Sequence, residues 1–65
     1  MKIKYFEDTD TLLIELKSGP VSETRDLDEN TLLDLDDQGR VLAITIEHAT
    51  ERTELQSISF DLMAA

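Results

Sequence analysis

The sequence predicts a mainly β fold, β-rich and at most α+β: a small antiparallel sheet of about five or six strands with a short helical turn near residues 48–54. Three observations lead to this class. The 65 residues are enough for a single small β-rich domain over residues 1–65 and leave no room for a second. Short runs of alternating apolar and polar residues follow one another, separated by turn-forming residues. Residues 30–47 hold two apolar runs around the sequence DDQG at residues 36–39, which is typical of a β-hairpin with glycine at positive φ.

The first two predicted strands are residues 2–6 and 11–16, joined by the polar turn EDTD. In the first, Ile3 and Tyr5 alternate with two lysines, which is the period of a strand. The second has leucine and isoleucine at every second position and ends before the breaker sequence SGP. We expect these two strands to pair as a hairpin.

Residues 21–29 predict a third, exposed strand. One of its faces is wholly polar and the other only half apolar, and such charges discourage unwanted pairing at the edge of a sheet. Residues 31–36 and 40–47 are the two arms of the DDQG hairpin. The second arm carries apolar side chains on both faces, with Leu42, Ile44 and Ile46 expected on one, which predicts a central strand covered on both sides.

The C-terminal segment, residues 55–63, fits two structures. As a strand, it alternates Ile58, Phe60 and Leu62 with serines and an aspartate. As a helix, it begins with a capping box of Thr53 and Gln56. We favour the strand because a helix leaves Phe60 outside the apolar stripe.

Charge restricts the function classes. Fifteen acidic residues against six basic ones give a net charge of −9, and such a surface repels the phosphate backbone of nucleic acids. We therefore expect no direct nucleic-acid binding, whereas a basic protein partner is electrostatically favourable. The longest apolar run, residues 41–44, is far shorter than the ~20 residues of a spanning helix. The N-terminal lysines precede no apolar signal segment, so we expect a cytoplasmic protein that does not enter membranes.

The chain is too small to build a large core. A domain of this length hides roughly 60% of the surface that its unfolded chain exposes, and without cysteine it has no disulfide to reinforce it. We therefore predict a non-enzymatic, acidic protein-interaction module that forms a homodimer or binds another protein. The candidate interface residues are the apolar residues of the DDQG hairpin: Leu33, Leu35, Val41, Leu42, Ile44 and Ile46.

The order of several blocks resembles a known family. Tyr5 followed by Asp10 and the run TLLIEL resembles the opening Tyr-x4-Asp-x-Leu-Tyr-Ile-x-Leu of the small prokaryotic family called "domain of unknown function 2283". Phe6 and Leu13 depart from its usual aspartate and tyrosine. The resemblance continues through residues 19–24, 33–44 and 46–50.

This resemblance implies a small β-rich cytoplasmic module. It brings no activity, substrate or catalytic residue, so no site is transferred from it. Some members look like the acidic half of a toxin and antitoxin pair, which implies an antitoxin-like partner of a basic toxin as a more specific form of the interaction module.

Asp34 and Asp36 are weak metal candidates, since the sequence DLDDQG imitates the start of a calcium loop. Such a loop needs a further oxygen ligand at the fifth position and a glutamate at the twelfth, where this chain has Gln38 and Thr45. A hairpin turn explains the aspartates and the glycine without any metal. We therefore expect no metal and no cofactor.

Asp10 and His48 are weak catalytic candidates. His48 is the only histidine, and a lone histidine does not make a zinc site without other nitrogen or sulfur ligands. Paired with a carboxylate it can serve as a general acid or base. The competing hypothesis is thus a small metal-dependent or acid–base hydrolase whose site forms across a dimer interface. The sequence favours a non-enzymatic protein, because no nucleophile motif accompanies these residues.

Overall fold

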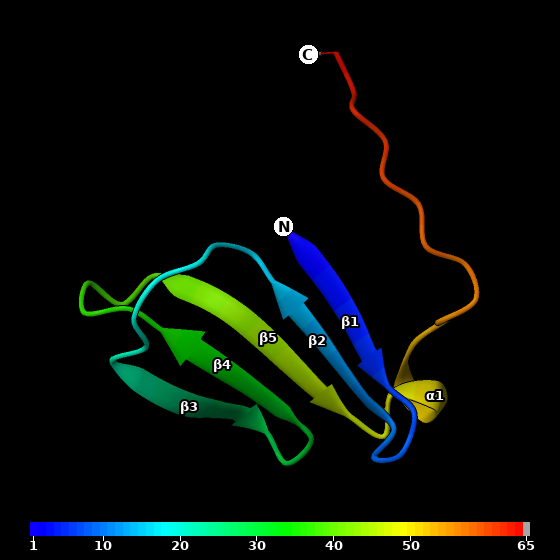
Figure 1. The fold of residues 1–65 in the computed structure, drawn as a ribbon, viewed down its shortest axis with the longest axis horizontal. Helices are drawn as coiled ribbons and strands as arrows, with labels where there is room; N and C mark the ends of the chain where they lie inside the picture. Colours follow the sequence, from blue (N-terminus) through cyan, green and yellow to red (C-terminus); the bar gives the residue numbers. More distant parts are fainter. Residues whose placement is uncertain (65) are drawn as a thin grey trace.

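The computed structural model describes residues 1–64 of the chain. Over these residues, one antiparallel sheet with the strand order β1-β2-β5-β4-β3 is followed by a single turn of helix (Figure 1). The elements are β1 (Lys2–Phe6), β2 (Thr11–Glu15), β3 (Glu23–Asp28), β4 (Thr31–Leu35), β5 (Val41–Glu47) and α1 (Ala49–Arg52). The prediction of a mainly β fold with a short helical turn is confirmed.

The strand order follows from three hairpins, β1–β2, β3–β4 and β4–β5, and one crossover. β1 pairs with β2, and β4 pairs with β5, as the sequence predicted. β5 is the central strand and β3 is an exposed edge strand. Between β2 and β3 the chain crosses the end of β5, where the amides of Leu16 and Lys17 donate to the carbonyl of Leu42 at 2.8 and 3.2 Å.

The DDQG turn has the expected conformation. Gly39 has φ of 78°, a region that glycine adopts without steric cost. The Asp36 carboxylate accepts hydrogen bonds from the backbone amides of Gln38 and Arg40, both at 2.9 Å. The turn is therefore closed by its own first aspartate, which is a common role for this residue.

One detail of the β4–β5 hairpin differs from the prediction. The register shifts so that Asp34 faces Ala43 while Leu35 faces Val41, which leaves Leu42 as an extra residue in β5. A β-bulge of this kind breaks the alternation of side chains. Leu42 consequently lies beneath the crossover, where an added Cβ on Gly19 would be 3.6 Å from its Cδ2 atom, and the expectation that it shares a face with Ile44 is wrong.

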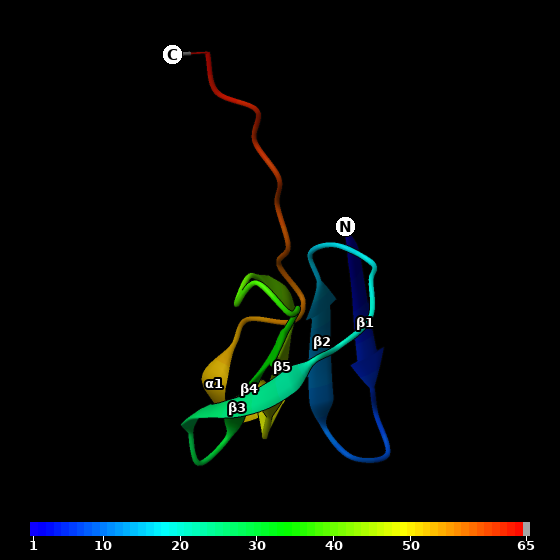
Figure 2. The same cartoon turned by 90° about the vertical axis from the view of Figure 1, so that its left-hand side faces the viewer.

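The sheet forms a single layer. Its principal extents are 36 × 34 × 18 Å, and Figure 2 shows α1 on one side of the sheet and the crossover on the other. We call the side that carries α1 the helix face and the opposite side the crossover face. Few apolar side chains are fully enclosed in this arrangement. The buried ones are Leu12, Leu35, Leu42, Ala43 and Ala49.

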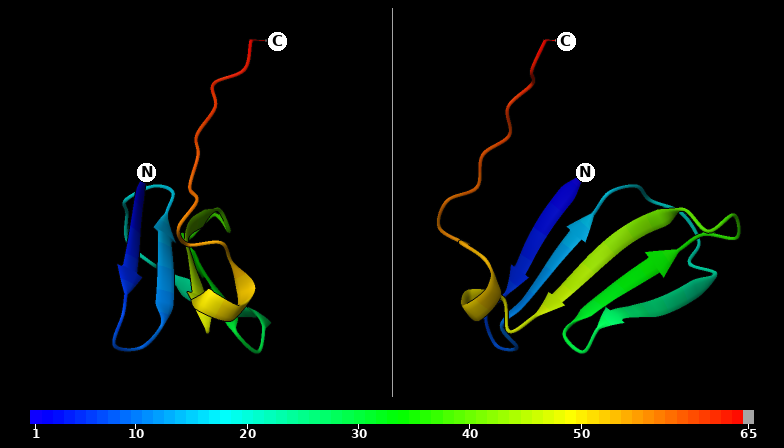
Figure 3. Two further views of the ribbon diagram at one scale, coloured as in Figure 1. Left: turned by 90° about the vertical axis from the view of Figure 1, so that its right-hand side faces the viewer. Right: turned by 180° about the vertical axis from the view of Figure 1, so that it is seen from behind.

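The strand favoured for residues 55–63 does not form, and neither does the alternative helix. Beyond α1 the chain runs as an extended segment that leaves the sheet (Figure 3). Phe60 and Leu62 are 83% and 90% exposed. Alternation marks a segment that is able to pair, but a strand also needs a partner strand, and this segment pairs with neither edge strand of the sheet, β1 or β3. No helix among residues 1–64 has the length and apolar character needed to cross a bilayer.

Candidate functional site

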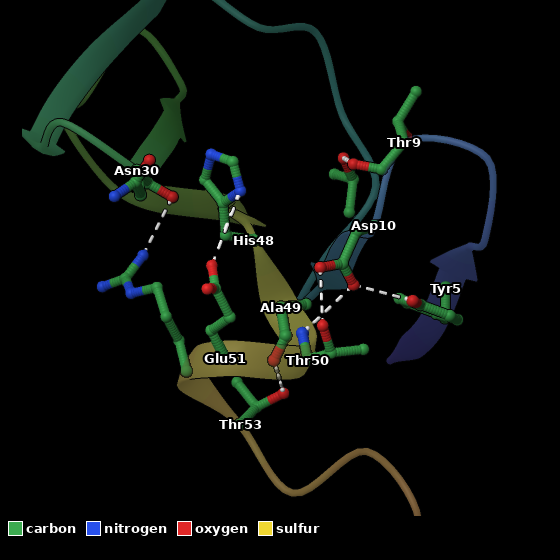
Figure 4. A network of polar contacts seen from close by, with 11 residues as sticks. Tyr5, Thr9, Asp10, Asn30, His48, Ala49, Thr50, Glu51 and Thr53 are labelled. Carbon is green, nitrogen blue, oxygen red and sulfur yellow. Dashed lines mark hydrogen bonds and ion pairs between the residues drawn. The ribbon is translucent and has the colours of Figure 1, made fainter.

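A network of polar contacts around Asp10 joins distant parts of the chain (Figure 4). Its Oδ1 atom accepts hydrogen bonds from the Tyr5 hydroxyl at 2.7 Å and from the Thr50 amide at 3.1 Å. Its Oδ2 atom accepts one from the Thr50 hydroxyl at 2.7 Å. The backbone carbonyl of Asp10 also accepts from the amide of Ala49 at 3.0 Å. This one residue therefore holds β1, the β1–β2 turn and α1 together.

Two residues in the left-handed conformation make the network possible. Asp10 ends the β1–β2 turn with φ of 52°, and His48 directly follows β5 with φ of 55°. Aspartate and histidine are among the residues that tolerate this conformation best. His48 occupies the N-cap position of α1 but makes no side-chain capping bond. Asp10 supplies the acceptors for the first amides of α1 from 40 positions earlier in the chain.

The electrostatics of the network favour a charged, hydrogen-bonded carboxylate. The Tyr5 hydroxyl, and after it the Thr50 hydroxyl, lower the pKa of Asp10 below its ordinary value of 3.8. The same hydrogen bond to Asp10 raises the pKa of Tyr5 above its ordinary value of 10.0. A general acid at neutral pH needs a raised carboxyl pKa instead. Asp10 is therefore suited to capping and not to donating a proton.

Arg52 holds the other end of α1. Its Nη1 atom donates to the carbonyl of Asn30 at 3.0 Å and to the hydroxyl of Thr31 at 2.9 Å. Its Nη2 atom lies 3.1 Å from Oδ2 of Asp28. The hydrogen bond from the amide of Asn30 lowers the pKa of Asp28 most, and a hydrogen bond with Thr31 and the charge of Arg52 lower it further. The sequence analysis missed Arg52 and Thr50, because their partners lie in distant parts of the sequence that local spacing does not connect to them.

The structure does not bring the two catalytic candidates into one pocket. The Nδ1 atom of His48 lies 3.8 Å from Oε2 of Glu51, and both side chains are exposed. In Figure 4 the imidazole points toward Glu51, while Asp10 is engaged by Tyr5 and Thr50. This arrangement gives no support to the hydrolase hypothesis.

The two metal candidates have separate partners. Asp34 accepts a hydrogen bond from the Thr24 hydroxyl at 2.7 Å. Asp36 binds its own turn and the Nε atom of Arg40 at 2.9 Å. Within residues 1–64, no three histidine, cysteine, aspartate or glutamate side chains are grouped closely enough to hold a metal ion.

The candidate interface residues divide into two groups. Leu35 and Leu42 are buried within the chain itself. The others, Leu33, Val41, Ile44 and Ile46, are half-buried.

The strand register places an apolar row across the helix face. Ile3 pairs with Ile14, Ile14 with Ile44, and Ile44 with Leu33. We call these four residues the apolar row; Arg25 of β3 stands at its end, opposite Leu33. The sequence analysis found Leu33 and Ile44 but missed Ile3 and Ile14, because the register of β1 and β2 against β5 was unknown.

The helix α1 covers a different row. Tyr5, Leu12, Ile46 and Thr31 pair across the same four strands. α1 lies over this second row, since Thr50 borders the same hollow as Tyr5 and Arg52 bonds to Thr31. The apolar row lies beyond α1, and its outermost residue, Ile3, is 45% exposed.

Comparison with known proteins gives one match. The family model described as "Protein of unknown function (DUF2283)" matches residues 2–49. The matched segment contains all five strands, both left-handed residues and the whole apolar row. No curated protein and no solved structure matches the chain.

Proposed function

Because the chain belongs to the DUF2283 family of proteins of unknown function, we propose its role from its own geometry: it is a small acidic interaction module that forms a homodimer through the helix face of its sheet. The observation that carries this proposal is the single-layer sheet whose apolar row is only partly covered: Ile3 is 45% exposed, and Ile14, Ile44 and Leu33 are half-buried. A sheet with one apolar face is stable only when another layer packs against that face. A helix of four residues covers only part of the face.

The dimensions of the chain support a missing second layer. A compact monomer of this mass is expected to expose about 4,200 Å², whereas this chain exposes 5274 Å². A compact chain of this length is also expected to have a radius of gyration of about 11 Å, and the value here is 12.9 Å. Part of both differences comes from the extended segment of residues 55–63, which leaves the sheet. The rest is consistent with a sheet whose helix face carries only one small helix.

The edges of the sheet are poor docking sites. β1 presents Lys2 and Lys4, and β3 presents several carboxylates and a register shift between Asp26 and Asp28. Charges and bulges of this kind discourage pairing between edge strands. The helix face is therefore the surface that we assign to the partner.

Two variants of one strand test this assignment. Ile3 and Phe6 are both 45% exposed in β1, but they point to opposite faces because they are an odd number of residues apart. We expect wild type and Phe6→Lys to have twice the monomer mass of 7.4 kDa in size-exclusion chromatography with light scattering. Ile3→Lys places a charge in the apolar row and should shift the protein to the monomer.

Two results would contradict the proposal. One is a wild-type protein that stays at 7.4 kDa at every concentration up to the millimolar range. The other is a dimer that Ile3→Lys leaves intact and Phe6→Lys dissociates, since this would place the interface on the crossover face.

A basic protein is the second candidate partner, and charge favours it. The chain carries a net charge of −9, and β3 is exposed along its whole length with three carboxylates against one arginine. Association of this kind weakens as salt screens the charges. A tagged chain should copurify with a basic protein, such as the product of an adjacent gene, at low salt and lose it at high salt. Failure to retain any basic protein at low salt would exclude this partner.

A further inference from the structure

The C-terminal segment, residues 55–63, carries the three most exposed large apolar side chains among the described residues, Phe60, Leu62 and Met63. Ile58 of the same segment is 62% exposed. Water-exposed apolar side chains in such a group mark a contact surface. The segment and the apolar row are thus two incompletely covered apolar surfaces within one chain.

We infer that in the homodimer residues 55–63 of each copy lie across the apolar row of the other copy. This inference rests on the proposed function and names the group that covers the row. The exchange is reciprocal, because a two-fold dimer makes each contact twice.

The dimensions of the two surfaces agree. In an extended segment Ile58, Phe60 and Leu62 point to the same side, and the distance from the first to the last is about 13 Å at ~3.3 Å per residue. The apolar row crosses four neighbouring strands, which is about 14 Å at ~4.8 Å per strand. Three apolar side chains can therefore contact the row along its whole width.

The segment begins near its own row but does not follow it. Leu55 and Ile58 border a shallow hollow together with Ile3 and Ile14. Beyond Ser59 the chain runs away from the sheet and past the start of β1 (Figures 1 and 3). In this course Phe60 and Leu62 do not contact Ile44 and Leu33 of their own chain, so they are available to a second copy.

The charges are compatible with this contact. Although the chain carries a net charge of −9, residues 55–63 contain only one charged side chain, Asp61. The apolar row ends at Arg25 of β3. A nearly neutral segment approaches an acidic chain with little repulsion. Arg25 is already paired with Glu23 at 3.1 Å, and Asp61 lies on the side of the segment opposite Phe60 and Leu62, so the contact itself is apolar.

Variants of the full-length chain test the inference. We expect the double variant Phe60→Ser with Leu62→Ser to weaken the dimer at least tenfold, measured as the dissociation constant by sedimentation equilibrium. The matched control changes Ser57 and Ser59 to alanine on the opposite side of the segment and should leave the constant unchanged. Circular dichroism checks that both variants keep the sheet.

Three outcomes would overturn the inference, and they are distinguishable. A dimer that is equally tight in wild type and in the double variant removes the exchange but leaves the proposed function standing. A wild-type monomer removes both. A wild-type monomer that becomes a dimer in the double variant would show that the segment covers the row of its own chain.

Disulfide trapping separates exchange from closure within one chain. The chain has no cysteine, so a pair of introduced cysteines reports one contact. Mixing the single variants Leu62→Cys and Leu33→Cys should yield a disulfide-linked heterodimer under mild oxidation. The control mixes Asp61→Cys, whose side chain points to the other side of the segment, with Leu33→Cys. This mixture should yield much less disulfide-linked heterodimer, and equal yields would contradict the exchange.

Discussion

Asp10 is the residue on which the arrangement of the chain most depends. It accepts hydrogen bonds from Tyr5, Ala49 and Thr50, and it does so from a left-handed backbone conformation. Asparagine also tolerates this conformation. Substitution by asparagine therefore keeps the turn and changes mainly the charge of the acceptor.

The single tyrosine of the chain reports on this contact. Tyr5 should titrate above its ordinary pKa of 10.0, because its hydroxyl donates to the Asp10 carboxylate. In Asp10→Asn the pKa should fall back toward 10.0, whereas Asp8→Asn in the same turn should leave it raised. Ultraviolet absorbance of the tyrosinate measures each value. An unchanged pKa in Asp10→Asn would show that this hydrogen bond does not form in solution.

Gly39 tests the conformation of the DDQG turn. Its φ of 78° disfavours residues with a Cβ, and no other atom lies within 4 Å of the added Cβ position. Gly39→Ala should therefore lower the free energy of unfolding by about 1 kcal/mol through backbone strain alone. Gly39→Asn should cost less, since asparagine tolerates positive φ better. Urea denaturation measures both, and equal stability of the alanine variant and wild type would contradict this turn geometry.

At the scale of elements, α1 exists because the sheet holds it. An isolated helix of four residues is unstable in water. Asp10 accepts hydrogen bonds from the first amides of α1, and Ala49 is fully buried. Arg52, the last residue of α1, bonds to Asn30 and Thr31 at the β3–β4 turn. The stability of α1 therefore depends on contacts with charged side chains.

Because charged side chains hold α1 on the sheet, the stability of the protein should depend on pH in the acidic range. The pKa values of Asp10 and Asp28 are lowered below 3.8 in the folded chain, so the unfolded chain binds protons first as the pH falls. Their contribution is complete well above pH 3.8 and is lost as the pH falls through the folded-state pKa values. Asp10→Asn should be less stable than wild type at neutral pH, and the difference should shrink below pH 3.8. Urea midpoints across this range measure it, and a constant difference would contradict the lowered pKa of Asp10.

At the scale of the whole molecule, the core is small for the area of the sheet. Its largest buried side chains are leucines near the start of β2, at the end of β4 and under the crossover. A core of this size rarely supplies more than roughly 3–5 kcal/mol. The free energy of unfolding that is lost when one cavity is created is therefore a large fraction of the total.

Leu12→Ala should destabilise the protein by about 2–5 kcal/mol, because Leu12 is buried under α1. The matched variant Leu16→Ala, just beyond the same strand and partly exposed, should cost clearly less. Thermal unfolding followed by circular dichroism compares the two. Equal losses would mean that Leu12 is not part of an enclosed core.

Local patterns predicted the elements of this fold and not their long-range contacts. Alternation and turn residues identified the strands, the edge position of β3 and the central position of β5, because these properties depend on neighbouring residues. The bulge at Leu42 was missed, since it arises from the crossover that packs above it. The segment at residues 55–63 has the pattern of a strand but no partner strand in its own chain.

The same distinction applies to the candidate site. Asp10 was identified as a carboxylate in a turn, but its partner Thr50 lies 40 residues away, and no spacing rule connects them. The apolar row needs the register of four strands, which alternation within one strand does not give. Asp36 was recognised as a turn residue because the turn is local, whereas Asp34 lies in β4 and accepts a hydrogen bond from Thr24 of β3.

The most direct test of the central claim, that the apolar row is an interface between copies, is isotope-filtered nuclear magnetic resonance on a mixture of labelled and unlabelled full-length chains. We expect intermolecular contacts from the methyl groups of Ile14, Ile44 and Leu33 in one copy to protons of the other, and none from the side chains of the crossover face. A sample at millimolar concentration that gives no intermolecular contact at these methyl groups would contradict the claim.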